Sequence, residues 1–210
     1  MFILSTDRYV EGIKNMYNVR ENFLDLKTEA LKNLEESQFE NKVDEKVLPV
    51  LDIINASNDY YTSSSCSGRI VLLEIPVIGD KINARFLGKW HRVITFDDLQ
   101  LAISHAEKGL LWLLAQSPVI HVGAKSVSSA DKLLKIAVSS GLKNSGFKSA
   151  GKKVVVEICS TERLDAPVGR DGRFFCNEEY FSLLIEIANN IIEKSYFKLQ
   201  RFENELKKRL

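Results

Sequence analysis

The chain has 210 residues, of which 45% are hydrophobic and 27% are charged. These proportions are those of a soluble globular protein, and they exclude a disordered chain and a collagen-like repeat. The longest strongly apolar stretch, residues 109–115, is far shorter than the roughly twenty residues of a membrane span. The amino terminus has no basic start and soon reaches Asp7, so we expect no signal peptide.

The charge is balanced overall but uneven along the chain. The net charge is +1, yet residues 1–60 carry 7 basic against 12 acidic side chains, and residues 61–160 carry 13 against 7. A basic middle is typical of a localised phosphate-binding face, although a solvated basic face without a partner explains the charge equally well.

Cysteine and histidine usage gives little support for a metal or disulfide framework. The three cysteines, Cys66, Cys159 and Cys176, include no Cys-x-x-Cys pair, which favours a cytoplasmic protein without disulfides. The three histidines also lack the spacing of metal ligands, so we predict no metal site.

The first sixty residues are expected to be helical. Phe23, Leu26, Ala30 and Leu34 form one apolar stripe at helical spacing. The polar stretch 35–42 is expected to end this helix. A second helix is predicted over residues 44–56, with Pro49 near its first turn.

Strand signals begin at Tyr60. Residues 60–62 and 69–75 are rich in β-branched and aromatic side chains, and residues 77–89 are predicted to form a loop. Two similar units are then expected. The first comprises a strand at 90–94, a helix at 96–108 and strands at 110–116 and 119–124. The second reuses the strand at 119–124, followed by a helix at 129–140 and strands at 143–148 and 154–160.

Capping patterns support the predicted helices. The two middle helices open with Ser/Thr-x-x-Asp, from Thr95 and from Ser128, which is typical of a capping box. Asn177 is expected to cap a long final helix whose apolar stripe continues to Leu206.

We therefore predict an α+β fold with a mixed β-sheet core, a duplicated βαββ unit and a long C-terminal helix. The whole chain, residues 1–210, is expected to form one domain. It is divided into a helical region at 1–58, an α+β core at 59–176 and the helix at 177–210.

Four segments carry side chains suited to chemistry. Residues 63–69 (Ser-Ser-Ser-Cys-Ser-Gly-Arg) combine small hydrogen-bond donors with a glycine between two strands, although an ordinary hairpin turn explains the composition too. Residues 89–92 form a basic, aromatic cluster around His91, and His121 alternates with apolar residues in a predicted strand. Residues 159–167 end a strand in polar side chains.

Two nucleotide-binding motifs are excluded by the sequence. In residues 141–149, Phe147 separates Gly146 from Lys148, and a helix precedes the segment where the phosphate loop requires a strand. The chain also has no Gly-x-Gly-x-x-Gly, the fingerprint of Rossmann dinucleotide and methyltransferase domains.

These segments, in this order, resemble the tRNA wybutosine-synthesizing protein 3 family. The resemblance covers about residues 23–202 and rests mainly on Ser-Ser-Cys-Ser-Gly-Arg at 64–69 and Lys-Asn-Ser-Gly at 143–146. It implies a non-Rossmann methyltransferase that uses S-adenosylmethionine. Its implied target is ring nitrogen N4 of the tricyclic guanosine beside the anticodon of phenylalanine tRNA.

The sequence departs from the family pattern at three places. Lys143 stands where family members often have Arg, and Ala124-Lys125 stands where some have Cys-Arg. Glu162-Arg163 replaces a His-Gly pair, so no role of that histidine carries over to this chain.

The resemblance and the residue chemistry together give a candidate site. Because the attacking nitrogen must lose a proton, we expect a histidine base, first His91 and second His121. Side chains expected to bind the donor or the base are Ser64, Ser65, Cys66, Ser67, Gly68, Arg69, Lys125, Lys143, Asn144, Ser145, Gly146, Ser160 and Thr161. Those expected to contact RNA are Lys89, Trp90, Arg92 and Lys148.

Two other functions remain open from the sequence. A non-catalytic tRNA-binding accessory protein of the same pathway needs the basic face but no methyl donor. A metal-dependent hydrolase built on Cys66, His91 and His121 has little support from the spacing of these residues.

Overall fold

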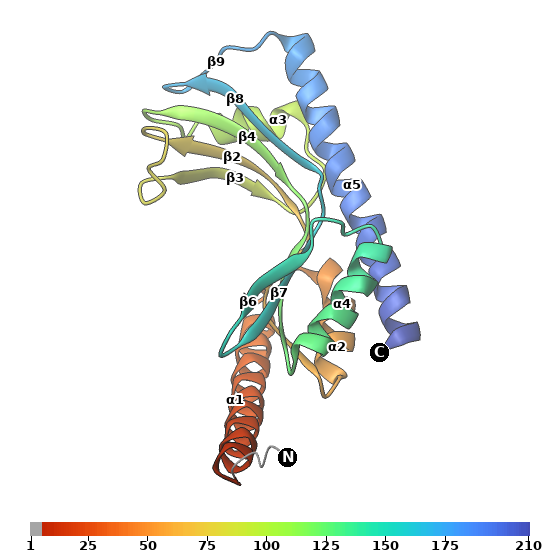
Figure 1. Ribbon diagram of the computed structural model, residues 1–210. Coiled ribbons are helices and arrows are strands. Elements are labelled where there is room, and N and C mark those ends of the chain that lie inside the picture. The colour runs from red at the N-terminus through yellow and green to blue at the C-terminus, as the bar shows by residue number, and fades with distance from the viewer. Residues whose placement is uncertain (1–5) are drawn as a thin grey trace.

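The computed structural model describes the backbone of residues 6–210 and the side chains of residues 22–210. It has the predicted α+β class (Figure 1). The expectation about a signal peptide concerns the amino terminus, where residues 1–5 lie outside the described part. The helices and strands, in chain order, are α1 Thr6–Phe39, a 3₁₀ turn Glu45–Val47, α2 Leu48–Ala56, β1 Tyr60–Cys66, β2 Arg69–Ile75, β3 Arg85–Trp90, α3 Phe96–Ile103, β4 Leu110–Gln116, β5 Val119–Ala124, α4 Val127–Ser139, β6 Gly146–Ala150, β7 Val154–Cys159, β8 Arg163–Arg170, β9 Arg173–Phe174 and α5 Glu178–Arg209.

The strands form two sheets. The four-stranded sheet has the order β1-β5-β7-β6, and the five-stranded sheet has the order β3-β2-β4-β8-β9. Every pairing within residues 6–210 is antiparallel, so the expected mixed sheet is replaced by two antiparallel ones. The duplicated unit does not form as predicted, because β4 and β5 belong to different sheets.

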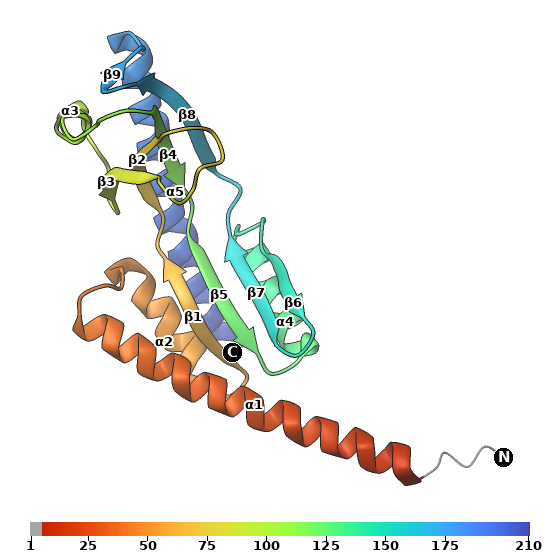
Figure 2. The ribbon, with the colours of Figure 1, turned by 90° about the vertical axis from the view of Figure 1, so that its left-hand side faces the viewer.

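Each sheet has its own hydrophobic core, and α5 packs against both. Leu199, Phe202 and Leu206 lie in the core of the four-stranded sheet, whereas Phe181 and Leu184 lie in that of the five-stranded sheet. The helix therefore lies along one side of both sheets (Figures 1 and 2). We call the opposite side, turned away from α5, the open face.

The C-terminal helix follows its predicted start and end. The Asn177 side chain accepts a hydrogen bond from the Tyr180 N–H, as an N-cap does, and three basic residues occupy the last turn. The helix predicted at 44–56 occurs as the 3₁₀ turn followed by α2, with proline in the first turn of α2 and with Leu51 and Ile54 buried.

Several predicted boundaries are wrong where side-chain contacts override local signals. Strand β1 continues through the serine-rich segment to Cys66, because its backbone pairs with β5 along this length. Strand β3 occupies 85–90, so its first five residues lie within the loop predicted at 77–89. Residues 91–94, predicted as a strand, are a connector, because Asn189 of α5 binds the Ile94 backbone N–H and carbonyl.

The helix limits and one other strand also shift. Helix α1 continues to Phe39, and Asn41 in the left-handed region (φ 55°) turns the chain afterwards. Helix α3 ends at Ile103, beyond which Glu74 accepts the Glu107 N–H. Helix α4 is capped by Ser126 and not Ser128, and β6 begins only at Gly146. The Thr95 capping box is confirmed.

Among residues 6–210, no helix combines the length and apolar character needed to cross a membrane.

Candidate functional site

The chain passes between the two sheets three times, and these passages lie side by side. We call residues 66–69, 116–119 and 159–163 the waist. A Cβ at Gly68 would lie 3.0 Å from the Gln116 carbonyl oxygen, and the Ser117 hydroxyl donates to the Ser160 carbonyl oxygen at 3.2 Å. Six of the thirteen residues expected to bind the donor or the base therefore lie at the waist.

Asp44 holds the first passage. Its Oδ2 accepts the Ser67 N–H at 2.8 Å and the Ser67 hydroxyl at 3.1 Å, and it lies 3.1 Å from His91 Nδ1. His91 Nδ1 is also 2.9 Å from the Gly68 carbonyl oxygen. Gly68 itself has a φ of +99°, which only glycine adopts without strain. The bend between β1 and β2, which lie in different sheets and form no hairpin, thus depends on an acid outside residues 63–69.

Cys66 lies beside this acid. Burial raises the pKa of the Cys66 thiol, Asp44 raises it further, and the Gly68 backbone and nearby basic side chains partly oppose these effects. Ligand atoms of Asp44, Cys66 and His91 lie within 4.8 Å of one another, which is close enough to hold a metal ion. Asp44 Oδ2 is nevertheless already engaged with Ser67 and His91, and the expectation of no metal stays a prediction.

His121 lies on the open face of the four-stranded sheet. Its strand neighbours Ile120 and Val122 are buried in the core, so the ring points the other way. Nδ1 is 2.8 Å from Ser64 Oγ, and Nε2 is 2.9 Å from Glu157 Oε2. Lys148 Nζ lies 2.9 Å from Glu157 Oε1. This places Lys148, predicted to contact RNA, beside the histidine.

The loop before β6 meets the third passage. Asn144 donates its N–H to the Cys159 carbonyl oxygen at 3.2 Å, and Cys159 donates its N–H to Ser145 Oγ at 3.1 Å. Lys143 is exposed next to them, and Gly146 pairs with Glu157. The Lys-Asn-Ser-Gly segment is therefore brought to the waist from a distant part of the chain.

Ser160 and Thr161 differ in their surroundings. Ser160 is buried, and its hydroxyl contacts Glu162 and the ammonium of Lys198 from α5, whereas Thr161 is exposed. Lys198 also binds Glu162 directly. The Glu162 that departs from the family pattern thus has a structural partner.

The open face of the five-stranded sheet carries Arg69, Lys89 and Trp112. The guanidinium Nε of Arg69 donates to Gln116 Oε1 at 2.8 Å. Val71 pairs with Lys89, and Leu73 pairs with Trp112. Trp112 Nε1 is the one buried side-chain donor or acceptor within residues 22–210 without a hydrogen-bond partner. A buried N–H without a partner is uncommon in native structures.

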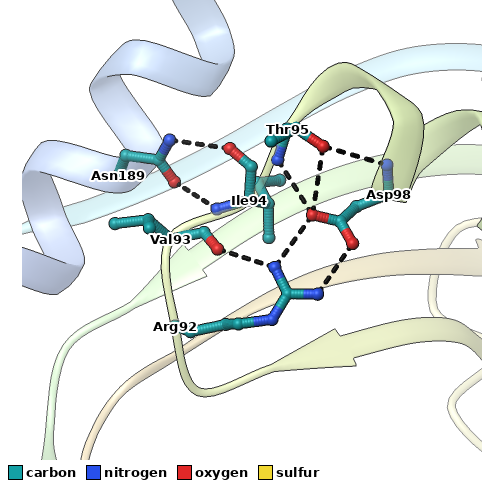
Figure 3. Close-up of polar contacts among 6 residues, drawn as sticks. All are labelled: Arg92, Val93, Ile94, Thr95, Asp98 and Asn189. Atoms are coloured by element: carbon teal, nitrogen blue, oxygen red, sulfur yellow. Dashed lines mark hydrogen bonds and ion pairs between the residues drawn. The ribbon is translucent and has the colours of Figure 1, made fainter.

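Two residues predicted to contact RNA have other partners. The Arg92 guanidinium binds both Asp98 carboxylate oxygens, at 2.7 and 2.9 Å, and donates to the Val93 carbonyl oxygen (Figure 3). Trp90 packs against the core of the five-stranded sheet. The bonds with Arg92 are the main reason that the Asp98 pKa is well below its usual value.

Lys125 lies apart from the other predicted residues. It follows β5 at the end away from the waist and pairs with Asp59, its Nζ 3.4 Å from Oδ1.

A cavity of about 260 Å³ lies between α1 and the edge of β1 at residues 62–65, in the predicted serine-rich segment. Ser64 and Ser65 line this cavity.

Four site residues were missed by sequence reasoning: Asp44, Gln116, Trp112 and Glu157. Glu157 is the single charged residue of β7, so its strand position was a usable signal. Trp112 is likewise the one aromatic residue of β4. Asp44 lies in a Val-Asp-Glu segment at 43–45 that also fits the family resemblance, but no role was predicted for it because its partners Ser67 and His91 are far away in the sequence.

Comparison with known proteins identifies the family. The family model described as Methyltransferase TYW3 matches residues 25–208. The chain belongs to this family. Two archaeal relatives carry the name tRNA(Phe) 7-((3-amino-3-carboxypropyl)-4-demethylwyosine(37)-N(4))-methyltransferase. The one from Pyrococcus horikoshii, numbered 1, is 46% identical over 89% of this chain and 95% of its own. That from Methanocaldococcus jannaschii is 39% identical over 88% and 96%.

Solved structures of similar proteins share the fold. The PH1069 protein from Pyrococcus horikoshii superposes with a TM-score of 0.85 and 45% identity, covering 90% of this chain and 98% of its own. A hypothetical protein from Aeropyrum pernix has a TM-score of 0.69 and 28% identity, covering 80% and 99%. The expected membership and the non-Rossmann fold class are therefore confirmed.

Proposed function

We propose that this chain is a tRNA(Phe) methyltransferase acting on N4 of the wyosine-type nucleoside at position 37. The observation that carries the proposal is the family match over residues 25–208, together with 46% identity to a relative named for this reaction. The proposal is also supported by the contacts among three segments at the waist, residues 64–69, 143–146 and 160–161, because methyl transfer depends on positioning two substrates.

The methyl donor in this proposal is S-adenosylmethionine. It supplies an electrophilic methyl carbon bound to a positive sulfur. Among the residues present, the Arg69 guanidinium suits its carboxylate. The small side chains at Ser67 and Gly68 let a ligand approach the backbone.

The nucleic acid in this proposal lies along the open face. Lys89, Lys148 and Arg163 are exposed basic residues on that side of the sheets. Because phosphate contacts release counterions, tRNA affinity is expected to fall steeply as salt concentration rises. His91 and His121 remain the two candidates for the proton acceptor.

The proposal is tested by transfer of labelled methyl from S-adenosylmethionine to tRNA isolated from a strain lacking this gene. Mass analysis of nucleoside 37 is expected to show one added methyl. A transcript with plain guanosine at this position serves as the control and is expected to accept none. Binding of the modified tRNA without any transfer would contradict the proposal and favour the accessory protein.

A matched pair of variants tests the donor site. Arg69→Ala is expected to raise the KM for S-adenosylmethionine about tenfold or more, because a charged hydrogen bond contributes about 1.5–3 kcal/mol. Lys132→Ala, exposed on α4 behind the four-stranded sheet, is expected to leave the KM unchanged. An Arg69→Ala enzyme with the wild-type KM would remove Arg69 from the donor site.

A further inference from the structure

Ser64, His121 and Glu157 form one continuous hydrogen-bonded chain across three neighbouring strands of the open face. Ser64 Oγ is 2.8 Å from His121 Nδ1, and His121 Nε2 is 2.9 Å from Glu157 Oε2. Strand β5 lies between β1 and β7, which fixes the order (Figure 2). The Ser64 side is exposed, whereas the side chains of His121 and Glu157 are only 30% and 22% exposed. This series of hydrogen bonds therefore runs from the exposed Ser64 to the more buried Glu157.

The charged end of this chain fixes the tautomer of the histidine. Burial raises the pKa of Glu157, but the bonds from Lys148 and His121 outweigh it and leave this pKa lowered. An ionised carboxylate accepts hydrogen bonds only, so Nε2 must carry the ring proton. Nδ1 then has a lone pair and accepts the hydroxyl proton of Ser64.

Three titratable groups face His121 or its partner from the neighbouring strands. Glu157 is negative. Lys148 is positive, since its bond to Glu157 raises its pKa. Cys159 Sγ lies 4.0 Å from Glu157 Oε1, and burial raises the pKa of this thiol. The carboxylate is thus the charge in direct contact with the ring, and it stabilises an imidazolium.

We propose that Ser64, His121 and Glu157 form a proton relay that deprotonates the target ring nitrogen, with Ser64 as the residue that touches it. The inference rests on the proposed function and adds Glu157 as a positioning residue. Both ring nitrogens of His121 are already engaged, so a substrate reaches this base only through the Ser64 hydroxyl.

The relay moves two protons in sequence. The N–H bond of the target nitrogen breaks, and its proton forms a new O–H bond with Ser64. The original Ser64 proton moves to Nδ1 of His121, where the imidazolium is paired with Glu157. The electron pair left on the nitrogen forms the bond to the methyl carbon while the carbon–sulfur bond of the donor breaks, and the electrons of that bond stay on sulfur, which leaves as a neutral thioether. Solvent later removes the proton from the His121 ring.

Variants at Ser64 test the outer end of the relay in the full chain. Ser64→Ala is expected to lower kcat about 100-fold with little change in tRNA affinity, the size typical of lost acid–base catalysis. Ser64→Thr keeps a hydroxyl in a strand and is expected to recover most of the rate. Ser63→Ala is the matched control, because Ser63 contacts only the His121 carbonyl oxygen, at 3.4 Å. A wild-type rate in Ser64→Ala would overturn the relay.

Glu157→Gln tests the inner end. The neutral amide no longer pairs with the imidazolium that the relay forms, so kcat is expected to fall while the affinity for tRNA stays unchanged. A variant that was merely destabilised would lose activity and tRNA binding in the same proportion. A wild-type kcat in a folded Glu157→Gln enzyme would contradict the positioning role.

Ring ¹⁵N NMR of the free protein separates failure of the relay from failure of the proposed function. The chain has three histidines, so His121→Gln identifies the signal by its loss. The wild type is expected to show the Nε2–H tautomer, and Glu157→Gln is expected to change it. An Nδ1–H tautomer would overturn the relay, whereas the absence of transfer by the wild type would overturn the proposed function.

Discussion

Glu162 holds its negative charge within the third waist passage, against Lys198 of α5. Burial raises its pKa, but the bonds from Lys198 and Ser160 outweigh this and lower the pKa to about 2 from the ordinary 4.5. The pair is mostly enclosed, with side chains 19% and 27% exposed. The ionised acid therefore links the waist to the long helix.

This depressed pKa predicts a pH dependence of stability. Its contribution is fully present above about pH 4.5 and is lost as the pH falls toward 2, because folding then requires a carboxylate that prefers to be protonated. The difference in unfolding free energy between wild type and Glu162→Gln is expected to shrink by up to about 3 kcal/mol across this window, and by about 2 kcal/mol between pH 7 and pH 3. Denaturant unfolding at pH 7 and pH 3 measures it. Glu36→Gln, which removes an exposed ion pair, is the control and is expected to lose stability with pH as the wild type does. An equal loss of unfolding free energy in wild type, Glu162→Gln and Glu36→Gln would contradict the depressed pKa of Glu162.

Among the elements, the connector between β3 and α3 depends on a distant helix. Asn189 of α5 accepts the Ile94 N–H at 2.8 Å and donates to the Ile94 carbonyl oxygen at 2.9 Å (Figure 3). Tyr196 of the same helix donates to the His91 carbonyl oxygen at 2.5 Å. These contacts, and not local propensity, keep residues 91–94 out of a strand and fix the backbone that carries His91.

Asn189→Ala is expected to lower the unfolding free energy by about 1–3 kcal/mol, because it leaves a buried N–H and carbonyl without a partner. It is also expected to raise hydrogen exchange at Ile94. Asn190→Ala, exposed on the next position of the helix, is the matched control. If the Ile94 amide exchanged equally slowly in both variants, the two Asn189 hydrogen bonds would not be what holds the connector in place.

At the scale of the whole molecule, α5 joins two hydrophobic cores. Phe202 is buried in the core of the four-stranded sheet and Phe181 in that of the five-stranded sheet, although both lie on one helix. The pair β1–β5 of one sheet is also joined across the waist to the pair β2–β4 of the other, because β1 leads into β2 and β4 leads into β5. This connectivity supports the single domain predicted for residues 1–210.

Phe181→Ala and Phe202→Ala test that prediction together. Each is expected to lower the unfolding free energy by about 3–5 kcal/mol while leaving one cooperative transition, because a helix shared by both cores couples them. Phe197→Ala, with the ring 67% exposed on the same helix, is expected to change it by less than about 0.5 kcal/mol. Calorimetry measures the unfolding free energy of each variant and the number of its unfolding transitions. Two separate transitions in either core variant would contradict a single domain.

Local patterns predicted those elements whose signals agree with their surroundings. The bounds of β2, β4 and β5 were predicted as they occur, and so were the cap and apolar stripe of α5. The predictions failed where a partner far away in the sequence decides the conformation, as at Ile94. They also failed where an edge strand continues through serines that local propensity assigns to a turn, as in β1.

The sequence by itself determined the family, the α+β class and the segments that carry hydroxyl, basic and imidazole groups, because each depends on residues close together in the chain. Only the tertiary structure decided which of these groups meet. The contacts of Asp44 with His91 and of His121 with Glu157 join residues separated by 47 and 36 positions. Such contacts depend on strand register and on the order of strands in each sheet, and both are fixed by long-range packing that a local pattern does not contain.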